Sequence, residues 1–270
     1  MTLEEATRRL SDAGIDNPRA EARLLLAHVM GISRDQTLTA QPTDGQAKAF
    51  AALVERRAAH EPFAYITGRK EFWSLDFEVG PGVLVPRPDT ETLIEEALRV
   101  APDRNAHLRI ADLGTGSGAI LIAALKEFPN ASGMGFESSP EAFRWASANV
   151  ARLIGDRAQI RLADWVSAEG PFDLVFSNPP YIASAEVESL MPDVADFEPH
   201  AALDGGPDGL AAYRELGELL PGLLAQGGHA LLEIGLGQAQ SMAALFPGLE
   251  MSRIAPDLSG VPRCVILRKP

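Results

Sequence analysis

The feature that most constrains the fold is an alternation of short apolar runs with helical stretches, which begins at Leu108 and continues to the C-terminus. Such alternation predicts an open, mostly parallel sheet with helices on both faces, an α/β fold of the Rossmann-like kind. It predicts seven strands, at residues 108–112, 132–137, 158–162, 172–177, 228–235, 249–254 and 263–268. It predicts helices between them at residues 117–128, 140–153, 208–224 and 237–246.

Residues 1–62 follow a helical pattern instead, and we expect a small bundle of short helices there. Thr2 and Glu5 have the spacing of a capping box, in which side chain and backbone bond reciprocally at a helix start. Asn17 precedes a proline, as an N-cap residue often does. Asp44 is the residue that we expect to cap the third helix. The chain therefore begins with a helical domain.

Residues 63–88 show a two-residue apolar period, which predicts a β-hairpin that links the two parts. The period is carried by Phe72, Trp73, Leu75, Phe77 and Val79. After it, Asp89 or Thr90 is expected to cap a helix that runs to Val100. We therefore divide the chain into a helical domain at residues 1–62, a hairpin linker at 63–88 and an α/β domain at 89–270.

The charge balance bears on the partners of the protein. The 37 acidic residues outnumber the 24 basic ones, and the net charge is −13. Proteins that clamp duplex nucleic acid present a basic face, since phosphate neutralisation supplies much of the affinity. We therefore expect no direct nucleic-acid partner. The five histidines are scattered without metal-ligand spacing, so we expect no metal site.

Two further features bear on the compartment. No apolar run approaches the roughly 20 residues that a membrane span needs, and the amphipathic, acid-containing N-terminus is unlike a signal peptide. Cys264 is the single cysteine, which rules out an internal disulfide and suits a reducing cytosol. We expect a cytoplasmic protein without a membrane partner. The sequence leaves the oligomeric state open.

A glycine-rich turn follows the first strand of the α/β part and leads directly into a helix. It reads DLGTGSG and contains Gly114, Gly116 and Gly118. Glycines at a strand-to-helix turn let the backbone pass close to a ligand and present N–H groups to it. In a dinucleotide fingerprint the third glycine comes three positions after the second, whereas here it comes two after. The spacing disfavours a nicotinamide dehydrogenase.

Two later strands end in residues that suit a nucleoside. Glu137 ends the second strand, where a carboxylate can accept hydrogen bonds from both ribose hydroxyls. The alternative interpretation is an exposed strand-end charge. Asp164 and Trp165 follow the third strand, where an acid can accept from an adenine amino group and an indole can stack on the base. A tryptophan is also a common core residue.

The fourth strand ends in Ser177-Asn178-Pro179-Pro180-Tyr181. Prolines cannot donate to a strand ladder, and each pushes the residue before it toward extended backbone. One interpretation is a strand end followed by a turn. The other is a rigid set of carbonyl acceptors at the carboxyl edge of the sheet, where ligands of such folds bind.

Taken together, the glycine turn, the strand-end acid and NPPY, without a phosphate-binding Lys-Ser/Thr, favour S-adenosylmethionine over ATP as the ligand. DLGTGSG with NPPY resembles the amino-directed S-adenosylmethionine-dependent methyltransferases. Further stretches narrow the resemblance to the HemK/PrmC family, which modifies the glutamine of the Gly-Gly-Gln loop in peptide chain release factors. They are EPFAYITGRKEFWSLDFEV, VLVPRPDTETLIEEAL, FEPHAALDGGPDGL, LLEIGLGQ and DLSGVPRCVILR.

The resemblance covers nearly the whole chain and implies roles for individual residues. The methionine part of the cofactor would lie along Gly114, Thr115, Gly116, Ser117 and Gly118. Glu137 would bind the ribose, and Asp164 and Trp165 would border the adenine. The substrate amide would contact Asn178, Pro179, Pro180 and Tyr181, with Asn178 between cofactor and substrate. The helical domain and the hairpin would help to dock the release factor.

The chain departs from the family pattern at two positions. The family more often has Asp where Glu137 stands, and often has an apolar residue where Ser138 stands. Both departures bear on cofactor affinity. Arg87, Asp89 and Glu91 are interpreted either as groups at the substrate entrance or as cap and surface charges. Glu198 and Glu233 receive no role from the sequence.

Other functions stay open at this stage. A sibling enzyme methylates a ribosomal-protein glutamine, and related NPPY enzymes methylate adenine N6, although the acidic balance argues against the flipping of a base out of a duplex. A non-catalytic S-adenosylmethionine-binding or translation-factor-docking module is a further alternative.

Overall fold

The computed structural model describes all 270 residues, which form two compact units. The first comprises Met1–Arg69 with Met191–Phe197, and the second comprises Lys70–Leu190 with Glu198–Pro270. The boundaries of the docking domain and linker that we draw from the sequence stay a prediction. None of the helices is both long and apolar enough to span a membrane.

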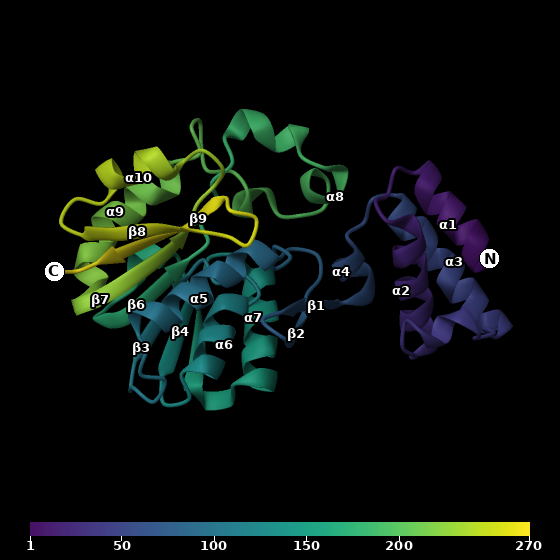
Figure 1. Cartoon of the computed structure of the whole chain (residues 1–270), viewed down its shortest axis with the longest axis horizontal. Coiled ribbons are helices and arrows are strands. Elements are labelled where there is room, and N and C mark those ends of the chain that lie inside the picture. The colour runs from purple at the N-terminus through teal and green to yellow at the C-terminus, as the bar shows by residue number, and fades with distance from the viewer. The chain divides into compact units, whose positions relative to one another are not determined.

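The first unit is helical, as its sequence pattern predicts (Figure 1). Its helices are α1 (Leu3–Asp12), α2 (Pro18–Met30), α3 (Asp44–Ala58), α4 (Phe63–Thr67), α8 (Pro192–Ala195) and the 3₁₀ helix η1 (Gln36–Leu38). Apolar side chains from α1, α2, α3 and α4 form one core, because each amphipathic helix must bury its apolar stripe against another. The largest fully buried members are Leu10, Leu25 and Phe50.

The caps of these helices agree only in part with the sequence predictions. The capping box of Thr2 and Glu5 is confirmed. Asn17 stands at the N-cap position of α2, but its backbone is left-handed and its side chain makes no cap bond. The prediction that Asp44 caps α3 is wrong. Thr43 has the extended backbone of an N-cap and accepts the N–H of Gln46, whereas Asp44 is already helical.

A buried guanidinium joins Met191–Phe197 to the rest of this unit. Arg57 on α3 pairs with Glu21 on α2 at 2.6 Å and with Asp193 on α8 at 3.5 Å. It also donates to the backbone carbonyl of Glu61. A buried charge needs such partners, since its desolvation is otherwise costly.

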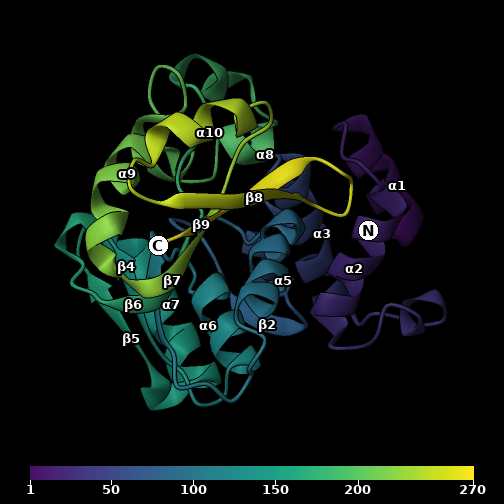
Figure 2. The same ribbon diagram turned by 60° about the vertical axis from the view of Figure 1, so that its left-hand side comes forward.

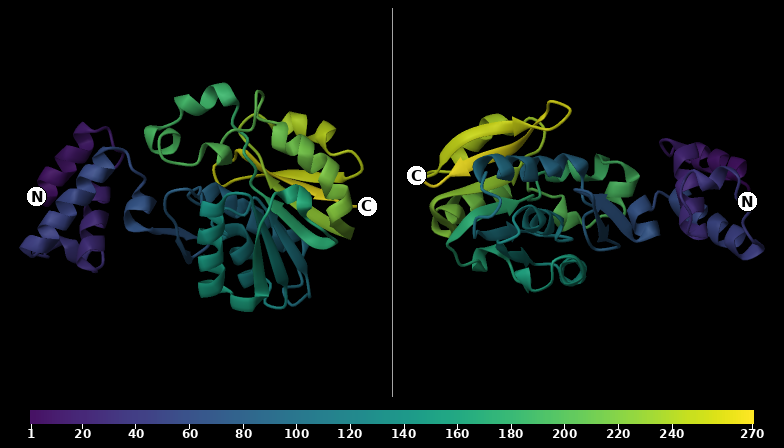
Figure 3. Two further views of the ribbon diagram at one scale, coloured as in Figure 1. Left: turned by 180° about the vertical axis from the view of Figure 1, so that it is seen from behind. Right: turned by 60° about the horizontal axis from the view of Figure 1, so that its bottom comes forward.

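The second unit is built on a seven-stranded sheet, which confirms the predicted fold. The strands are β3 (Arg109–Leu113), β4 (Ser132–Glu137), β5 (Ala158–Leu162), β6 (Phe172–Ser177), β7 (Leu224–Glu233), β8 (Glu250–Pro256) and β9 (Pro262–Arg268). Their order is β5-β4-β3-β6-β7-β9-β8. The pairs from β5 to β7 are parallel, while β9 runs antiparallel to both β7 and β8. Figure 3 shows β8 and β9, in yellow, at one edge of the sheet.

Helices cover both faces of this sheet, which gives a three-layer unit (Figures 1 and 2). Helices α5 (Glu91–Val100), α6 (Ala119–Glu127) and α7 (Pro140–Leu153) pack side by side on one face, and α9 (Ala211–Leu223) and α10 (Ala239–Leu245) pack on the other. The core under α9 and α10 includes Val175, Tyr213 and Leu232. The sheet is apolar on both faces because both are covered.

The predicted hairpin is also present, as strands β1 (Arg69–Phe72) and β2 (Leu75–Glu78) in a sheet of their own. Its two tip residues, Trp73 and Ser74, both have positive φ, which is the backbone of a tight two-residue hairpin turn. Phe72 and Phe77 meet edge to face with ring centroids 6.2 Å apart. The hairpin therefore contributes two buried aromatic rings to its unit.

The corrected cap of α3 leads to a testable difference. We expect Thr43→Ala to lower the free energy of unfolding by about 1 kcal/mol, because the N–H of Gln46 loses its acceptor. Asp44→Ala should cost only a few tenths of a kcal/mol, roughly the weaker attraction of an acid to the helix N-terminus. Urea unfolding followed by circular dichroism measures both, and the reverse ranking would return the cap to Asp44.

Candidate active site

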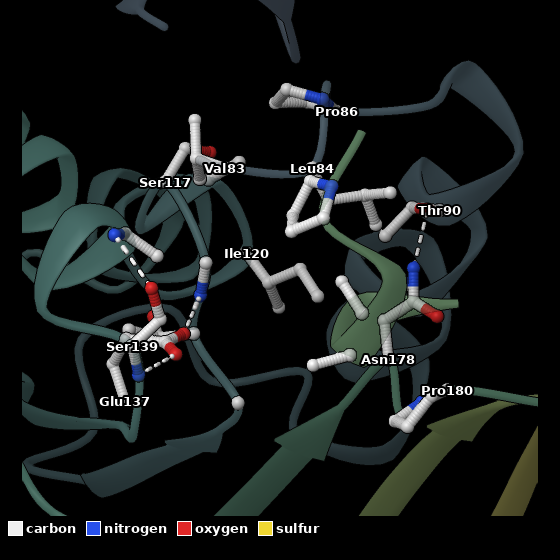
Figure 4. A pocket seen from close by; sticks show the side chains of 18 of the residues that line it. Val83, Leu84, Pro86, Thr90, Ser117, Ile120, Glu137, Ser139, Asn178 and Pro180 are labelled. Atoms are coloured by element: carbon white, nitrogen blue, oxygen red, sulfur yellow. Dashed lines mark hydrogen bonds between the residues drawn. The ribbon is translucent and has the colours of Figure 1, made fainter. Parts of the chain in front are cut away.

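One pocket of the second unit lies at the carboxyl ends of β3, β4 and β6 (Figure 4). In an open α/β sheet this is the edge where ligands bind. The predicted site residues that line it are Gly114, Thr115, Gly116, Ser117, Glu137, Trp165, Asn178 and Pro180. The other predicted residues, Gly118, Asp164, Pro179 and Tyr181, are not part of its lining.

The glycine turn forms the floor of the pocket between β3 and α6. Gly114, Gly116 and Gly118 have φ angles of 72°, 57° and 81°, a backbone conformation that favours glycine. A Cβ on Gly114 would stand 3.3 Å from the Trp165 ring. The nearest atom to a Cβ on Gly116 would be Val83 Cγ2 at 4.0 Å, so this glycine borders open space. The turn therefore leaves room for a ligand directly above Gly116.

Glu137 at the end of β4 lies against this turn. Its carboxylate accepts the backbone N–H of Gly116 at 2.9 Å and that of Ser139 at 2.8 Å. The side chain is buried, and burial raises the pKa of Glu137, which the backbone donors oppose. The interpretation of Glu137 as an exposed strand-end charge is wrong. Each carboxylate oxygen keeps a lone pair with which to accept a ligand hydroxyl.

Of the two predicted adenine contacts after β5, Trp165 lines the pocket and Asp164 does not. Trp165 lines the pocket and donates from Nε1 to Glu215 Oε2 at 3.2 Å. Asp164 accepts the backbone N–H of Val166 at 3.0 Å and thereby caps the 3₁₀ helix η4 (Trp165–Ser167). The structure thus brings the indole to the pocket and engages the Asp164 carboxylate in a helix cap.

The segment after β6 forms the opposite wall. Figure 4 shows Asn178 across the pocket from Glu137, with its amide nitrogen directed at Thr90. Asn178 Nδ2 donates to Thr90 Oγ1 at 3.3 Å. The hydroxyl of Tyr181 donates to Glu233 Oε1 at 3.2 Å, and Tyr181 is not part of the pocket lining. The loop therefore presents Asn178 and Pro180 to the pocket, and the Tyr181 hydroxyl is held by Glu233.

Two other segments hold this loop by its backbone. The N–H of Ile182 donates to the carbonyl of Leu203, and the N–H of Gly205 donates to the carbonyl of Ile182. A Cβ on Gly205 would lie 2.8 Å from the Pro180 carbonyl oxygen, so only glycine allows this approach. The side chain of Gln238 donates to the carbonyl of Tyr181 at 2.9 Å. The stretches DGGPDGL and LLEIGLGQ thus pack directly around NPPY.

Comparisons with known proteins place this geometry in a family. A family model described as PrmC N-terminal domain matches residues 2–68, and one described as Methyltransferase small domain matches residues 90–194. A release factor glutamine methyltransferase of Rhodospirillum rubrum is 46% identical over 275 residues, which cover 99% of this chain and 84% of that protein. The chain belongs to the release factor glutamine methyltransferase family.

A second relative agrees with this assignment, and a solved structure agrees with the fold. The release factor glutamine methyltransferase of Caulobacter vibrioides is 44% identical over 96% of this chain and 92% of its own length. A methyltransferase of Pyrococcus furiosus has a crystal structure that matches with a TM-score of 0.50 at 22% identity, over 74% of this chain and 91% of that one. The latter likeness supports the fold alone.

Sequence reasoning for this family member missed most of the apolar lining. Val83, Leu84 and Pro86 come from the segment between the hairpin and α5, and Figure 4 shows them along one side of the pocket. The run VLVP belongs to the linker and to a stretch that carries the family resemblance, but its pattern assigns none of its residues to the site. Pro199, Ala201 and Ala202 also line the pocket. They belong to FEPHAALDGGPDGL, which carries the resemblance without assigning them a role.

The structure gives a partner to each of the charged residues Arg87, Asp89 and Glu91. Arg87 lines the pocket and pairs with the buried Glu198 at 2.7 Å. Asp89 pairs with Arg263 at 3.4 Å, and Glu91 accepts the backbone N–H of Trp73 at 2.7 Å. Of the three, Arg87 alone reaches the pocket.

A buried acid lies under the glycine turn. Asp112, the residue before the last one of β3, is fully buried and accepts the hydroxyl of Thr115 at 2.6 Å. Burial raises the pKa of Asp112 to about 7, while the Thr115 hydroxyl acts in the opposite direction. Near neutral pH the carboxyl is therefore partly protonated in the folded chain.

This shift predicts how stability depends on pH. Between about pH 4 and pH 7 the folded chain holds a proton on Asp112 that the unfolded chain has lost, so stability falls as pH rises through this window. Asp112→Asn removes this component. The free energy of unfolding of the variant minus that of the wild type should rise by on the order of 1 kcal/mol per pH unit across the window. Chemical denaturation at pH 5, 6 and 7 tests this, and a constant difference would contradict it.

Proposed function

We propose that the protein transfers a methyl group from S-adenosylmethionine to the side-chain amide nitrogen of the glutamine in the Gly-Gly-Gln motif of peptide chain release factors. The observation that carries the proposal is that Asn178 at the start of NPPY and Glu137 beside the glycine turn face one pocket. Relatives 46% and 44% identical, over nearly the whole chain, are named release factor glutamine methyltransferases. Both the site and the family therefore support the same reaction.

The pocket fits the cofactor. Glu137 has a fixed carboxylate with lone pairs left for ribose hydroxyls, and Gly116 borders open space in which a methionine chain can lie. Trp165 offers a ring for the adenine, with Asp164 beside it. In this proposal Gly114 to Gly118 bind the methionine part. When bound, S-adenosylmethionine supplies a methyl group on a positively charged sulfur.

The chain's own residues position the substrate amide. An amide nitrogen is a weak nucleophile, since its lone pair is delocalised into the carbonyl. We propose that Asn178 Oδ1 and the Pro179 carbonyl each accept one N–H of the glutamine, which aims the nitrogen lone pair at the methyl group. Pro180 and the Tyr181 ring would contact the flat amide and exclude water. The nitrogen loses one N–H proton to solvent once it carries the methyl group. This is therefore catalysis by positioning and fixed dipoles, without a strong general base.

The partner is proposed to be a protein. The excess of acidic residues opposes the binding of duplex nucleic acid, so adenine N6 is disfavoured as a target. Residues 1–62 and the hairpin would dock the release factor. The family model that matches residues 2–68 describes the N-terminal domain of this family, which supports a separate domain at this end of the chain.

Methyl transfer to purified substrates tests the function. The protein would be incubated with S-adenosylmethionine and unmodified release factor, followed by mass spectrometry of the Gly-Gly-Gln peptide. We expect one added methyl on the glutamine, absent when that glutamine is Ala. Transfer to ribosomal protein or to nucleic acid alone would overturn the substrate, and transfer to none would overturn the reaction.

The role of Asn178 predicts a large kinetic effect. Asn178→Ala should lower turnover by about two to three orders of magnitude, the effect of losing one preorganised polar group. Asn130→Ala, an exposed asparagine that bonds the backbone of Asn105, serves as control and should leave turnover unchanged. Undiminished turnover of Asn178→Ala would refute the positioning mechanism.

The open space at Gly116 predicts a binding effect with a matched control. Gly116→Ala should weaken S-adenosylmethionine binding roughly tenfold or more, since a methyl group forced into occupied space costs about 1–3 kcal/mol. Gly155 has a similar φ of 64° and nothing within 4 Å of its Cβ position. Gly155→Ala therefore introduces similar backbone strain outside the pocket. Calorimetric titration of both variants should show weakened binding for Gly116→Ala alone, and equal affinities would contradict the assignment.

A further inference from the structure

A buried carboxylate stands directly behind the NPPY loop. Glu233 ends β7, and its side chain is 1% exposed. Its Oε2 accepts the hydroxyl of Thr90 at 2.5 Å, and its Oε1 accepts the hydroxyl of Tyr181 at 3.2 Å. A buried charge is costly, so a carboxylate held here by two hydroxyls calls for a reason beyond packing.

The register of the sheet puts this carboxylate beside Asn178. Strands β6 and β7 are parallel, and Ser177 pairs with Leu232. Asn178 and Glu233 each come one residue further along their strands. The two side chains are therefore neighbours at the sheet edge although 55 positions separate them in the sequence.

Thr90 connects the two side chains. It holds the N-cap position of α5 but has a helical backbone and makes no cap bond. The sequence predicts that Asp89 or Thr90 caps this helix; the N-cap position falls to Thr90, but its side chain makes no cap bond. The hydroxyl instead donates to Glu233 and accepts Asn178 Nδ2 at 3.3 Å. The start of α5 thus lacks the usual side-chain cap, because the Thr90 hydroxyl bonds Glu233 and Asn178 instead.

The hydrogen bonds that join Asn178, Thr90 and Glu233 fix which end of the Asn178 amide faces Thr90. Thr90 donates its single hydroxyl proton to Glu233, which is the direction that an ionised carboxylate requires, since it can only accept. Thr90 Oγ1 can then only accept, and the group that Asn178 turns toward it must be the NH₂. Figure 4 shows the Asn178 nitrogen directed at Thr90 and the oxygen directed away from it.

We propose that Glu233, acting through Thr90, fixes the rotation of the Asn178 side-chain amide, so that Oδ1 is always the acceptor offered to the substrate. Glu233 and Thr90 are positioning residues, and neither touches the reacting atoms. The inference rests on the proposed function of Asn178. Without the chain of hydrogen bonds the amide can turn over and present its NH₂ to the substrate N–H groups, which it would repel.

The surroundings of Glu233 act on its pKa in both directions, and their net effect is a rise. Burial raises the pKa of the Glu233 carboxyl, and the Asp89 charge acts in the same direction. The hydroxyls of Thr90 and Tyr181 and the guanidinium of Arg263 oppose that rise. The Thr90 bond therefore also helps Glu233 to remain the acceptor that orders the chain.

Steady-state kinetics on four single variants and one double variant test the inference. Thr90→Val removes the hydroxyl at nearly constant volume, and Thr90→Ser restores it. Thr92→Val makes the same change at a buried threonine of α5 that no hydrogen bond joins to Asn178 or Glu233, and it serves as the matched control. Glu233→Gln keeps the shape of the carboxylate and adds a donor. The double variant combines Thr90→Val with Glu233→Gln.

We expect Thr90→Val and Glu233→Gln each to lower kcat roughly tenfold to a hundredfold, as the loss of one hydrogen bond to a charged group does. The KM for the release factor should change much less than kcat, since the helical domain and the hairpin are proposed to dock the release factor. The cofactor affinity should stay unchanged, since no contact of either residue with the cofactor is proposed. The double variant should be no slower than the slower single variant, because both substitutions interrupt the same series of hydrogen bonds. Thr90→Ser and Thr92→Val should keep wild-type kcat.

Failure of this inference and failure of the proposed function give different results when Asn178→Ala is assayed in parallel. Wild-type kcat in Thr90→Val beside an inactive Asn178→Ala would overturn the inference and leave the function in place. Full activity in Asn178→Ala would overturn both. Should Glu233→Gln not fold, the comparison of Thr90→Val with Thr90→Ser and Thr92→Val decides the question without it.

Discussion

The parallel pairing of β3 with β4 and β6 is the constraint on which the site depends. Ala111 lies beside both Met134 and Val175 in register, so the three strands end at one edge of the sheet. The glycine turn, Glu137 and Asn178 each follow one of these ends, and they meet in one pocket although they come from distant parts of the sequence. The pairing of β7 with β6 extends the same edge and adds Glu233 behind Asn178.

This arrangement places three acidic side chains in the interior near one pocket. Burial raises the pKa of Asp112, Glu137 and Glu233, so each acid weakens the folded state at the pH where it would be charged outside the protein. Residues that conflict with stability in this way are expected at functional sites. Hydrogen bonds from Thr115, from backbone N–H groups and from Thr90 and Tyr181 offset part of that cost.

Sequence reasoning was most successful where a period repeats along the chain. The seven strands are predicted within a few residues, because apolar runs bounded by turns have few other interpretations. It was least successful where one side chain has a choice of partners. Thr90 could cap α5 or bond Glu233, and Asp44 competed with Thr43 as a cap. A decision between such partners depends on which group the fold brings near.

In the candidate site too, residues of local motifs could be predicted from the sequence, whereas residues that depend on tertiary position could not. Glycines 114 and 116, Glu137 and Asn178 belong to local motifs with a direct physical reason, and all four line the pocket. Val83 and Pro199 line it as well, and although they belong to stretches that carry the family resemblance, their side chains have no chemistry that predicts a role in the site. Glu233 likewise has no sequence signal of its role, because that role depends on the register of β6 with β7.

A crystal structure of the protein with S-adenosylhomocysteine and an unmodified release factor tests the central claim most directly. The account predicts that the carboxamide nitrogen of the Gly-Gly-Gln glutamine lies within hydrogen-bond distance of both Asn178 Oδ1 and the Pro179 carbonyl oxygen, and faces the cofactor sulfur. A glutamine bound elsewhere, or an Asn178 amide turned with its NH₂ toward the substrate, would contradict it.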